Sequence, residues 1–425
     1  MRRPVLRAVA AAAVSALIVS LGAASAPAQQ KPDPNYPTPA GSIEFWHWRA
    51  EDKPWLDDLI KKFQNQHPGT TITQVILPSG EYQATAFQKI RNNPKAAVFT
   101  AFRGPQFTTM ATSGLMLPLT GQPFLANVYP EALRVATLGN TVYGVPYHNL
   151  FNMPIYNTEI FAKEGIKPPT TWDGWLQMCR TLKAKGYIPI AFPGATRGQA
   201  GQIMNTMFMN EMPTDNYFGR LGTGTASVSD PWFLGVAQKY EQMAQAGCFQ
   251  DNASGTPEAA ANALFAQGRA AIMPTGSFSM GAIKVLNPAM SGKMQLMAPI
   301  TRANPKYEGI RNNTFIFGVN DLASDPDQQI ALSFINFMLK PGNAQTYALG
   351  TSQHVTVKGV KYDANVDLKN TGVWLDRKTL LAPRFQILNQ QVVDNVADLL
   401  TAIAGGRSAN DAVADFGARI KAILG

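Results

Sequence analysis

The stretch IEFWHWRAEDKPWLDDLIKKFQNQHPGTTITQV, residues 43–75, decides the fold class. β-Branched and aromatic residues at 43–46 and at 71–75 predict two strands. Between them, Asp52 and Pro54 predict the start of a helix, because an acidic cap followed by proline is typical of a first turn. The helix places its apolar residues at helical spacing: Trp55, Leu56, Leu59, Ile60 and Phe63. A strand, a helix and a second strand in this order predict parallel strands covered by a helix.

The same alternation recurs along the chain. Thr171 predicts the cap of another helix, Gly186 ends it, and a strand is expected at 188–192. Pro326 predicts the start of a further helix, and Val413, Phe416, Ile420 and Ile423 have the apolar spacing of a C-terminal helix. The sequence therefore predicts an α/β protein with mostly parallel sheets flanked by helices.

The N-terminus has the pattern of a secretion signal. Arg2, Arg3 and Arg7 precede an apolar run at 8–21, and Ala26-Pro27-Ala28 fits a cleavage site before Gln29. We therefore expect residues 1–28 to be a signal peptide, 29–41 to be a proline-rich linker, and the mature protein to be periplasmic. No cysteine lies near the cleavage site, so a lipid anchor is not expected. An uncleaved membrane anchor is the alternative.

Length and charge limit the possible functions. The 425 residues exceed what one hydrophobic core usually holds. Removal of the signal peptide lowers the formal net charge from +9 to +6, and no Lys/Arg tract concentrates that charge. Nucleic acid is therefore not an expected partner. Cys179 and Cys248 could pair in an oxidising compartment or remain two buried thiols.

Motifs for catalysis, nucleotides and metals are missing from the sequence. There is no P-loop, no dinucleotide fingerprint and no G-x-S-x-G elbow. Glu51 and Asp52 occupy positions where helix-capping residues are usual. The histidines lack metal-ligand spacing; they are His47, His67, His148 and His354. We therefore predict no catalytic residue, no metal and no cofactor.

Five segments, in order and spacing, resemble the family 1 extracellular solute-binding proteins of ABC importers, the maltose-binding-protein-like group. The resemblance covers essentially the whole mature chain. It implies a periplasmic-binding-protein type 2 fold, with two α/β lobes joined by three hinge crossings. The segments are Ile43–Trp48, Gly114–Leu119, Val142–Tyr147, Pro168–Asp173 and Phe265–Met273.

The resemblance also places the lobe boundaries and the crossings. Ligand is expected between the lobes, where the carboxyl ends of strands expose loops. The predicted ranges are 42–147 plus 302–352 for lobe 1, 148–301 plus 353–425 for lobe 2, and 146–150, 299–302 and 351–357 for the crossings.

A sugar needs flat aromatic faces for its C–H surfaces and forked or amide partners for its hydroxyls. Residues of these kinds at expected strand ends or in loops facing the cleft are the predicted ligand contacts. They are Trp46, Trp48, Arg103, Tyr147, Trp232, Ser277, Phe278, Asn312 and Asn313.

The resulting hypothesis is a monomeric binding component of an ABC importer. It captures a carbohydrate, closes about its hinge and delivers the ligand to membrane permease subunits. Two alternatives remain open: a binding protein for a polyol, a phosphorylated polyol or a polyamine, and an exported hydrolase.

Overall fold

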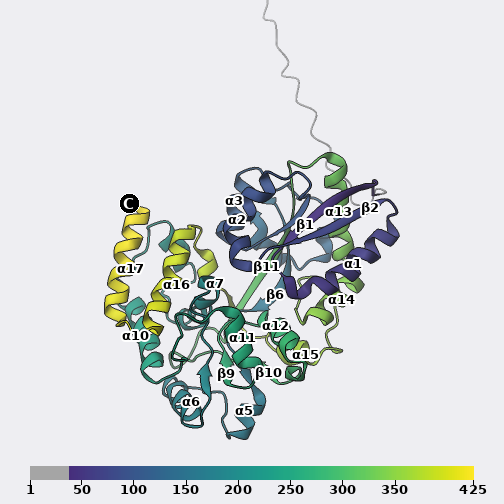
Figure 1. Ribbon diagram of the computed structural model, residues 1–425. Coiled ribbons are helices and arrows are strands. Elements are labelled where there is room, and N and C mark those ends of the chain that lie inside the picture. Colours follow the sequence, from purple (N-terminus) through teal and green to yellow (C-terminus); the bar gives the residue numbers. More distant parts are fainter. Residues whose placement is uncertain (1–37) are drawn as a thin grey trace, which may run out of the picture. The chain divides into compact units, whose positions relative to one another are not determined.

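The computed structural model describes residues 38–425, so the predicted signal peptide and most of the linker lie outside the described residues. The first of its two main sheets has six strands in the order β12-β11-β3-β1-β2, with β6 paired to β11 (Figure 1). These strands are β1 (Gly41–His47), β2 (Thr70–Ile76), β3 (Val98–Ala101), β6 (Val145–Phe151), β11 (Gly309–Val319) and β12 (Thr379–Leu381).

Alternation along β1 explains how helices cover both faces of this sheet. Ile43 and Phe45 lie in the core beneath α1 and α13, whereas Trp46 lies in the core beneath α2 and α3. The helical elements of this first lobe are η1 (Ala50–Asp52), α1 (Lys53–Gln66), α2 (Ser79–Arg91), α3 (Pro105–Thr112), η2 (Pro123–Asn127), α4 (Pro130–Leu133), η3 (Arg134–Ala136), α13 (Asp325–Met338) and α14 (Pro341–Thr351). A small hairpin joins β4 (Thr137–Leu138) to β5 (Thr141–Val142).

The second lobe contains a four-stranded sheet in the order β10-β7-β9-β8. Its strands are β7 (Ile155–Asn157), β8 (Ile188–Ile190), β9 (Ala270–Met273) and β10 (Met294–Leu296). Its helices are α5 (Thr158–Lys163), α6 (Trp172–Ala184), α7 (Arg197–Ala200), α8 (Gln202–Phe208), α9 (Tyr217–Gly222), α10 (Pro231–Gln245), α11 (Glu258–Ala266), α12 (Ser279–Leu286), η4 (Pro288–Met290), α15 (Val366–Gly372), η5 (Pro383–Gln386), α16 (Gln390–Ala404) and α17 (Ala409–Leu424).

The α/β class is confirmed, but the sheets are mixed rather than mostly parallel. In the first sheet, β1 runs parallel to β2 and β3, while β11 runs antiparallel to β3 and β6. In the second sheet, only β8 and β9 are parallel. The long strands β6 and β11 pair with each other in opposite directions as the chain leaves and re-enters the first lobe. The repeated strand–helix pattern gave no sign of that reversal.

The predicted lobe boundaries stay a prediction, although packing suggests a shift of one of them. Tyr307 donates its backbone N–H to Asn210, and Lys306 pairs with Asp215, so residues 302–308 lie against the second lobe. We therefore propose that the second crossing lies within β11 rather than near residue 302.

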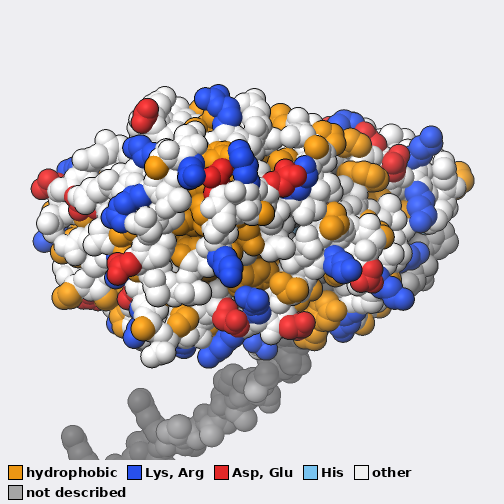
Figure 2. All heavy atoms as spheres, turned by 90° about the horizontal axis from the view of Figure 1, so that it is seen from below, with side chains coloured by type: hydrophobic (Ala, Val, Ile, Leu, Met, Phe, Trp, Pro, Cys, Tyr) orange, Lys and Arg blue, Asp and Glu red, His pale blue; other side chains and the backbone are white. Residues whose placement is uncertain are grey.

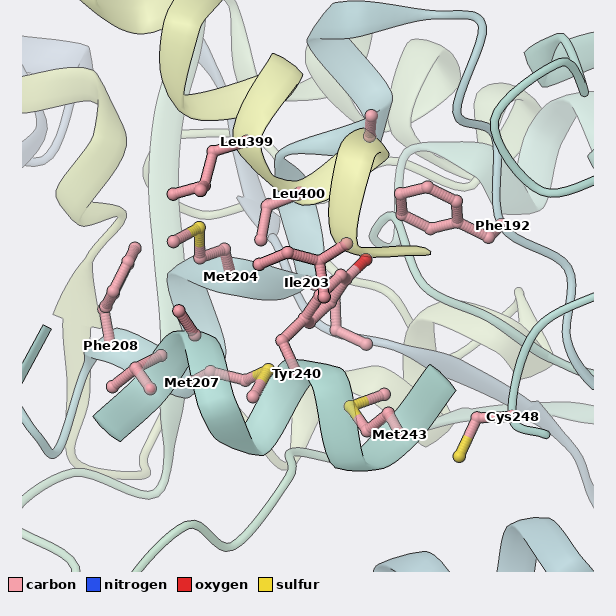
Figure 3. Close-up of a cluster of buried hydrophobic side chains, with 14 of the residues drawn as sticks. Phe192, Ile203, Met204, Met207, Phe208, Tyr240, Met243, Cys248, Leu399 and Leu400 are labelled. Atoms are coloured by element: carbon pink, nitrogen blue, oxygen red, sulfur yellow. The ribbon is translucent and has the colours of Figure 1, made fainter. Parts of the chain in front are cut away.

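Helices of the second lobe share one core. Figure 3 shows Tyr240 of α10 directed toward Ile203 of α8 and Leu400 of α16, and these residues belong to one buried cluster with Met204 and Met243. The predicted cap of α6 is confirmed, since the Thr171 side chain accepts a hydrogen bond from the Gly174 N–H at 3.1 Å.

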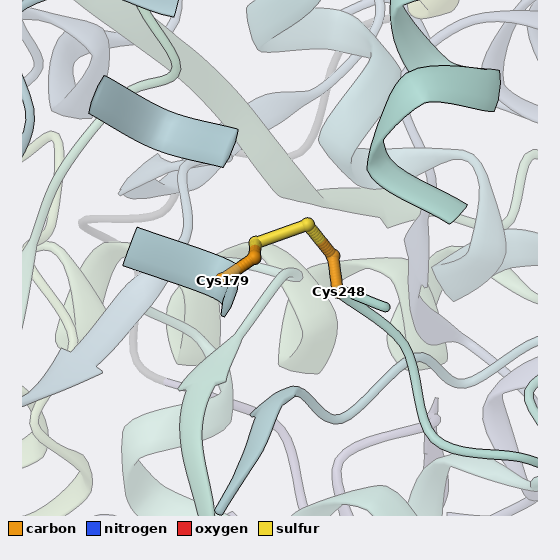
Figure 4. The surroundings of a disulfide bond; sticks show 2 residues. All are labelled: Cys179 and Cys248. Atoms are coloured by element: carbon orange, nitrogen blue, oxygen red, sulfur yellow. A yellow bond between two sulfur atoms is a disulfide. The ribbon is translucent and has the colours of Figure 1, made fainter. Parts of the chain in front are cut away.

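Cys179 and Cys248 form a disulfide in this lobe, with 4.9 Å between their Cα atoms (Figure 4). The bond links α6 to the segment that follows α10, across 69 residues of sequence. A closed loop of this length stabilises a folded chain by a few kcal/mol, roughly 2–4. The alternative of two buried thiols is therefore set aside.

Charge is dispersed over the surface. On the face shown in Figure 2, basic and acidic side chains are interspersed rather than gathered into separate patches. Several of the basic groups are paired, among them Lys306 with Asp215 and Arg197 with Asp398.

Candidate functional site

A cavity of about 290 Å³, here called the cleft cavity, lies between the two lobes. Its first wall comes from the turns after β1 and β3 and from strands β6 and β11. Its second wall comes from helices α7, α8, α11 and α12 and from η5. The lining residues are Trp48, Arg49, Glu51, Ser79, Phe102, His148, Leu150, Asn152, Gln199, Gln202, Glu258, Ala259, Asn262, Phe278, Ala282, Asn312, Thr314 and Phe385.

Trp48 provides a fixed aromatic face on the first wall. Its ring stacks on Phe102, with centroids 3.7 Å apart and planes 18° apart, and meets Phe315 edge-on at 5.1 Å. From the second lobe, Phe278 and Phe385 add further aromatic surface. Rigid rings on both walls can cover the C–H faces of a ligand at low entropic cost.

Arg49 holds two carboxylates beside Trp48. Its Nε donates to Asp52 Oδ2 at 2.6 Å and its Nη2 to Asp52 Oδ1 at 3.0 Å, while its Nη1 lies 3.1 Å from Glu51 Oε1. The forked pair with Asp52 neutralises the guanidinium. Asp52 makes no side-chain bond as a helix cap, so its role is to orient Arg49.

His148 is neutral and fixed by the same network. Its Nε2 lies 2.6 Å from the Tyr347 hydroxyl, and that hydroxyl donates to Asp52. The Tyr347 oxygen must then accept, so His148 carries its proton on Nε2. Burial lowers the pKa of His148 well below its usual value, which keeps the ring uncharged.

Glu258 is the acidic group of the second wall. It opens α11, and its backbone N–H donates to the Thr196 hydroxyl at 3.0 Å. Burial, together with the nearby negative charge of Glu51, raises the pKa of Glu258 to about 7. Burial also raises the pKa of Glu51. The carboxylates of Glu51 and Glu258 thus interact electrostatically within one cavity.

Buried amides add hydrogen-bond acceptors. Gln202 donates Nε2 to the Gly198 carbonyl at 3.2 Å, so its Oε1 must accept from Asn152 Nδ2 at 2.9 Å. That arrangement leaves Asn152 Oδ1 without a hydrogen-bond partner among the described residues. Asn262 Oδ1 and Gln199 Oε1 also have no partner there. The groups of this cavity that lack partners are therefore mainly acceptors, which suits a ligand rich in hydroxyl donors.

Among the predicted contacts, Trp48, Phe278 and Asn312 are brought together in this cavity. Arg103 lies beside it, with its Nη1 donating to Asn312 Oδ1 at 3.1 Å. The ligand contacts themselves stay predictions.

The other five predicted contacts do not line the cavity, because each has a partner elsewhere. Trp46 is buried in the first lobe and donates its indole N–H to Glu44. Tyr147 lies in the core, with its hydroxyl on the Met338 carbonyl. The remaining three are Trp232, packed on Tyr217 and Phe208; Ser277, whose hydroxyl accepts from the Phe151 N–H; and Asn313, paired with Asn149.

Sequence reasoning missed most of the polar lining. Glu51 was interpreted as a helix-capping residue. Its position shortly after the carboxyl end of β1 could have indicated that it faces the cleft. Glu258 follows Pro257 in a helix first turn, where acidic residues are common for reasons unrelated to ligands. Gln202 and Asn262 lie on helices whose orientation toward the cleft no local pattern reveals.

No group of three or more His, Cys, Asp and Glu side chains within residues 38–425 could hold a metal ion. In the same range, no helix is long and apolar enough to cross a membrane.

Comparison with known proteins identifies the family. Residues 47–345 match the family model described as bacterial extracellular solute-binding protein. This match covers more than half of the chain. The chain belongs to this family. Its members are binding proteins, and the resemblance of the five sequence segments is confirmed.

Three similar proteins illustrate the range of the family. The multiple sugar-binding protein of Streptococcus mutans is 22% identical over 334 residues, which are 77% of this chain and 78% of that protein. The sn-glycerol-3-phosphate-binding periplasmic protein UgpB of Brucella abortus is 23% identical over 258 residues, 57% of this chain and 58% of that protein. A solved chitin oligosaccharide binding protein matches with a TM-score of 0.78 at 18% identity, covering 89% of this chain and 98% of that one. The structural match confirms the two-lobe type 2 fold.

Proposed function

We propose that this solute-binding protein captures a carbohydrate in the cleft cavity and delivers it, unchanged, to the permease subunits of an ABC importer. The protein acts as a monomer after export and cleavage near Ala28. Closure of the two lobes about the crossings buries the ligand, and the closed form is what the permease recognises.

One observation carries this proposal: the cleft cavity combines aromatic faces from both lobes with buried acceptors of the second lobe that have no partner among the described residues. Trp48 and Phe278 suit the C–H faces of a sugar ring. Glu51, Glu258 and the free Asn152 Oδ1 suit its hydroxyls, since each hydroxyl that loses water without a partner costs about 1–3 kcal/mol. The names of the sugar-binding relative and of the chitin oligosaccharide binding structure agree with this ligand class.

Non-sugar ligands fit the cleft cavity less well. A phosphate placed there would meet the carboxylates Glu51 and Glu258, while Arg49 is already neutralised. A polyamine would gain from the carboxylates but would leave the amide acceptors and the three aromatic faces largely unused.

The pair Glu51 and Glu258 also gives the hydrolase alternative a specific test, because glycosidases use two carboxyl groups. Incubation of the protein with oligosaccharides that it binds should release no new reducing ends. Release of such ends that disappears in Glu258→Gln would establish turnover and contradict the binding-only proposal.

The proposal is tested by thermal shift, followed by calorimetry, over neutral mono- and oligosaccharides, with glycerol 3-phosphate and spermidine for comparison. A ligand that binds only the native state raises the melting temperature. We expect at least one neutral saccharide to raise it, and the rise to be lost in Trp48→Ala. A response to glycerol 3-phosphate or spermidine alone would contradict the carbohydrate assignment.

A further inference from the structure

A second cavity, of about 390 Å³, adjoins the cleft cavity, and Ser79 and Phe385 line both. We call it the arginine cavity because three arginines line it. Its residues come from α2 and the β3–α3 turn on one side and from α7, η5 and α16 on the other. They are Ser79, Gly80, Gln83, Ala84, Arg103, Pro105, Ala195, Thr196, Arg197, Gly198, Arg384, Phe385, Gln390, Val393, Asp394 and Ala397.

Arg384 is the most buried charge of this cavity, with 5% of its surface exposed. Its Nη2 donates to the Gly198 carbonyl at 2.7 Å, but neither Nε nor Nη1 has a partner within the described residues. Burial lowers the pKa of Arg384 to about 10, against an opposing effect of Asp394. A buried guanidinium with two unused donors is costly unless an acceptor meets it.

The backbone is adapted to hold this guanidinium. A methyl group on Gly201 would lie 2.0 Å from Arg384 Nη1, so a larger residue there would displace the guanidinium from this position. The Arg384 backbone N–H is fixed as well, by Asn205 Oδ1 at 2.9 Å. The position of the unused donors is therefore set by several contacts rather than by chance packing.

Arg103 faces the same cavity from the first lobe. Its one hydrogen bond is the contact from Nη1 to Asn312, and it forms no ion pair with any carboxylate of residues 38–425. Burial alone lowers the pKa of Arg103 to about 10. Arg197 differs, because Asp398 already accepts from its Nε at 2.8 Å and its Nη2 at 3.2 Å. Two of the three arginines, Arg103 and Arg384, thus form no ion pair within residues 38–425, although Asp394 lies near Arg384.

We propose that the arginine cavity binds an anionic group, a carboxylate or a phosphate, on a ligand whose neutral sugar unit occupies the cleft cavity. Arg384 and Arg103 would each offer a planar fork of donors, the geometry that matches carboxylate and phosphate oxygens. The acceptor-rich cleft cavity repels such a group, so the charge fixes which end of the ligand enters which cavity. This inference rests on the proposed function and narrows it to acidic carbohydrates.

Calorimetry with matched probe pairs tests the inference. The pairs are cellobiose with its glucuronosyl-glucose counterpart, glucose with glucuronate, and glucose with glucose 6-phosphate, in a low-salt buffer. We expect the anionic member of at least one pair to bind roughly tenfold tighter or more, as charge-assisted hydrogen bonds allow. Comparison of the uronate pairs with the glucose 6-phosphate pair shows whether the cavity prefers a carboxylate or a phosphate.

Variants locate the effect. Arg384→Gln and, from the opposite lobe, Arg103→Gln should bring the ratio of the two dissociation constants close to one. Arg197→Gln removes a charge that is already paired and should retain the preference. Circular dichroism identifies any variant that fails to fold, and the other arginine variant then decides.

Each outcome bears on a different claim. Equal binding of the members of every pair, or a preference that survives both Arg384→Gln and Arg103→Gln, would overturn the anion cavity and leave the proposed function standing. Binding of anions without any neutral saccharide would support the anion cavity and contradict the neutral subsite. Binding of no probe would overturn both.

Discussion

The two walls of the cleft cavity present different kinds of side chain to a ligand. The first wall is a stacked aromatic pair, Trp48 on Phe102, beside the charge network of Arg49, and both stand at the end of a central strand. The second wall offers amides and one titrating carboxyl, Glu258, carried by short helices. Substitutions in the first wall should therefore remove apolar contact with the ligand. Substitutions in the second wall should remove hydrogen bonds to the ligand that depend on pH.

The largest expected effect concerns the scaffold behind the second wall. Replacement of both cysteines, Cys179→Ala with Cys248→Ala, should lower the free energy of unfolding by about 2–4 kcal/mol, because the unfolded chain is no longer cross-linked. Urea unfolding of the two proteins measures the loss. Hydrogen exchange should accelerate in α6 and α10 and stay unchanged in β1 and β3; equal acceleration in both lobes, or no loss of stability, would contradict this assignment.

Glu258→Gln tests the second wall directly. Removal of a charged acceptor should weaken the binding of a neutral saccharide by about 1.5–3 kcal/mol, or roughly 10- to 150-fold, at pH 8. In the native protein, affinity should fall as the pH drops through about 7, because the carboxylate of Glu258 then gains a proton. In the variant, the part of this pH dependence that comes from Glu258 should be absent. Glu159→Gln, a surface carboxylate paired with Lys293, serves as the control and should behave like the native protein.

The same carboxyl predicts a change in stability with a definite sign. Burial, together with the negative charge of Glu51, raises the pKa of Glu258 in the folded, ligand-free protein from its ordinary value of 4.5 to about 7. Its neutral form therefore favours folding, and this contribution is lost as the pH rises from about 4.5 through 7. Thermal unfolding should show Glu258→Gln to be more stable than the native protein at pH 8 and equally stable at pH 4. A variant less stable at pH 8 would refute the burial of this charge.

Trp48→Ala tests the first wall. Loss of the ring should weaken saccharide binding by about 1–3 kcal/mol, and by the same factor at pH 6 and pH 8. Trp48→Phe keeps a flat face and should recover much of the affinity. Calorimetry at both pH values distinguishes the two walls; a pH-dependent loss in Trp48→Ala would remove the contrast between them.

The smallest effect is expected at Trp232, which the sequence suggested as a ligand contact. The residue is partly buried and packs edge-on against Tyr217 and Phe208 of the second-lobe core, outside the cavity. Trp232→Phe should therefore lower stability by on the order of 1 kcal/mol and leave affinity unchanged within error. A clear loss of affinity in a folded variant would restore the sequence-based assignment.

The sequence predicted the first wall better than the second for a physical reason. Alternation along a strand and the position of its carboxyl end indicate which side chains reach a cleft, and the prediction for Trp48 was made in this way. Asn312 was predicted from the family resemblance as a loop residue before a strand, but it lies within β11. Even there, Trp46 lies two residues before Trp48 yet is covered by helices, because the strand continues through residue 47 and only Trp48 lies beyond it.

The second wall carries no comparable local signal. Glu258, Gln202 and Phe385 approach the cavity from three elements that are far apart in sequence, and only the packing of α11, α8 and η5 brings them together. The antiparallel course of β11 was hidden for the same reason, since strand direction depends on the route of the chain between lobes. The element types could be predicted from local patterns, and their mutual arrangement could not.

The most direct test of the account is a crystal structure of the mature protein with the neutral saccharide that binds most tightly in the thermal-shift panel. We expect the sugar ring to lie within about 4 Å of the Trp48 ring, with a hydroxyl donating to Glu258 at hydrogen-bond distance. Such a complex would show both walls holding one ligand. A saccharide that contacts only one lobe, or that binds outside the cleft cavity, would contradict the claim that the two lobes capture it together.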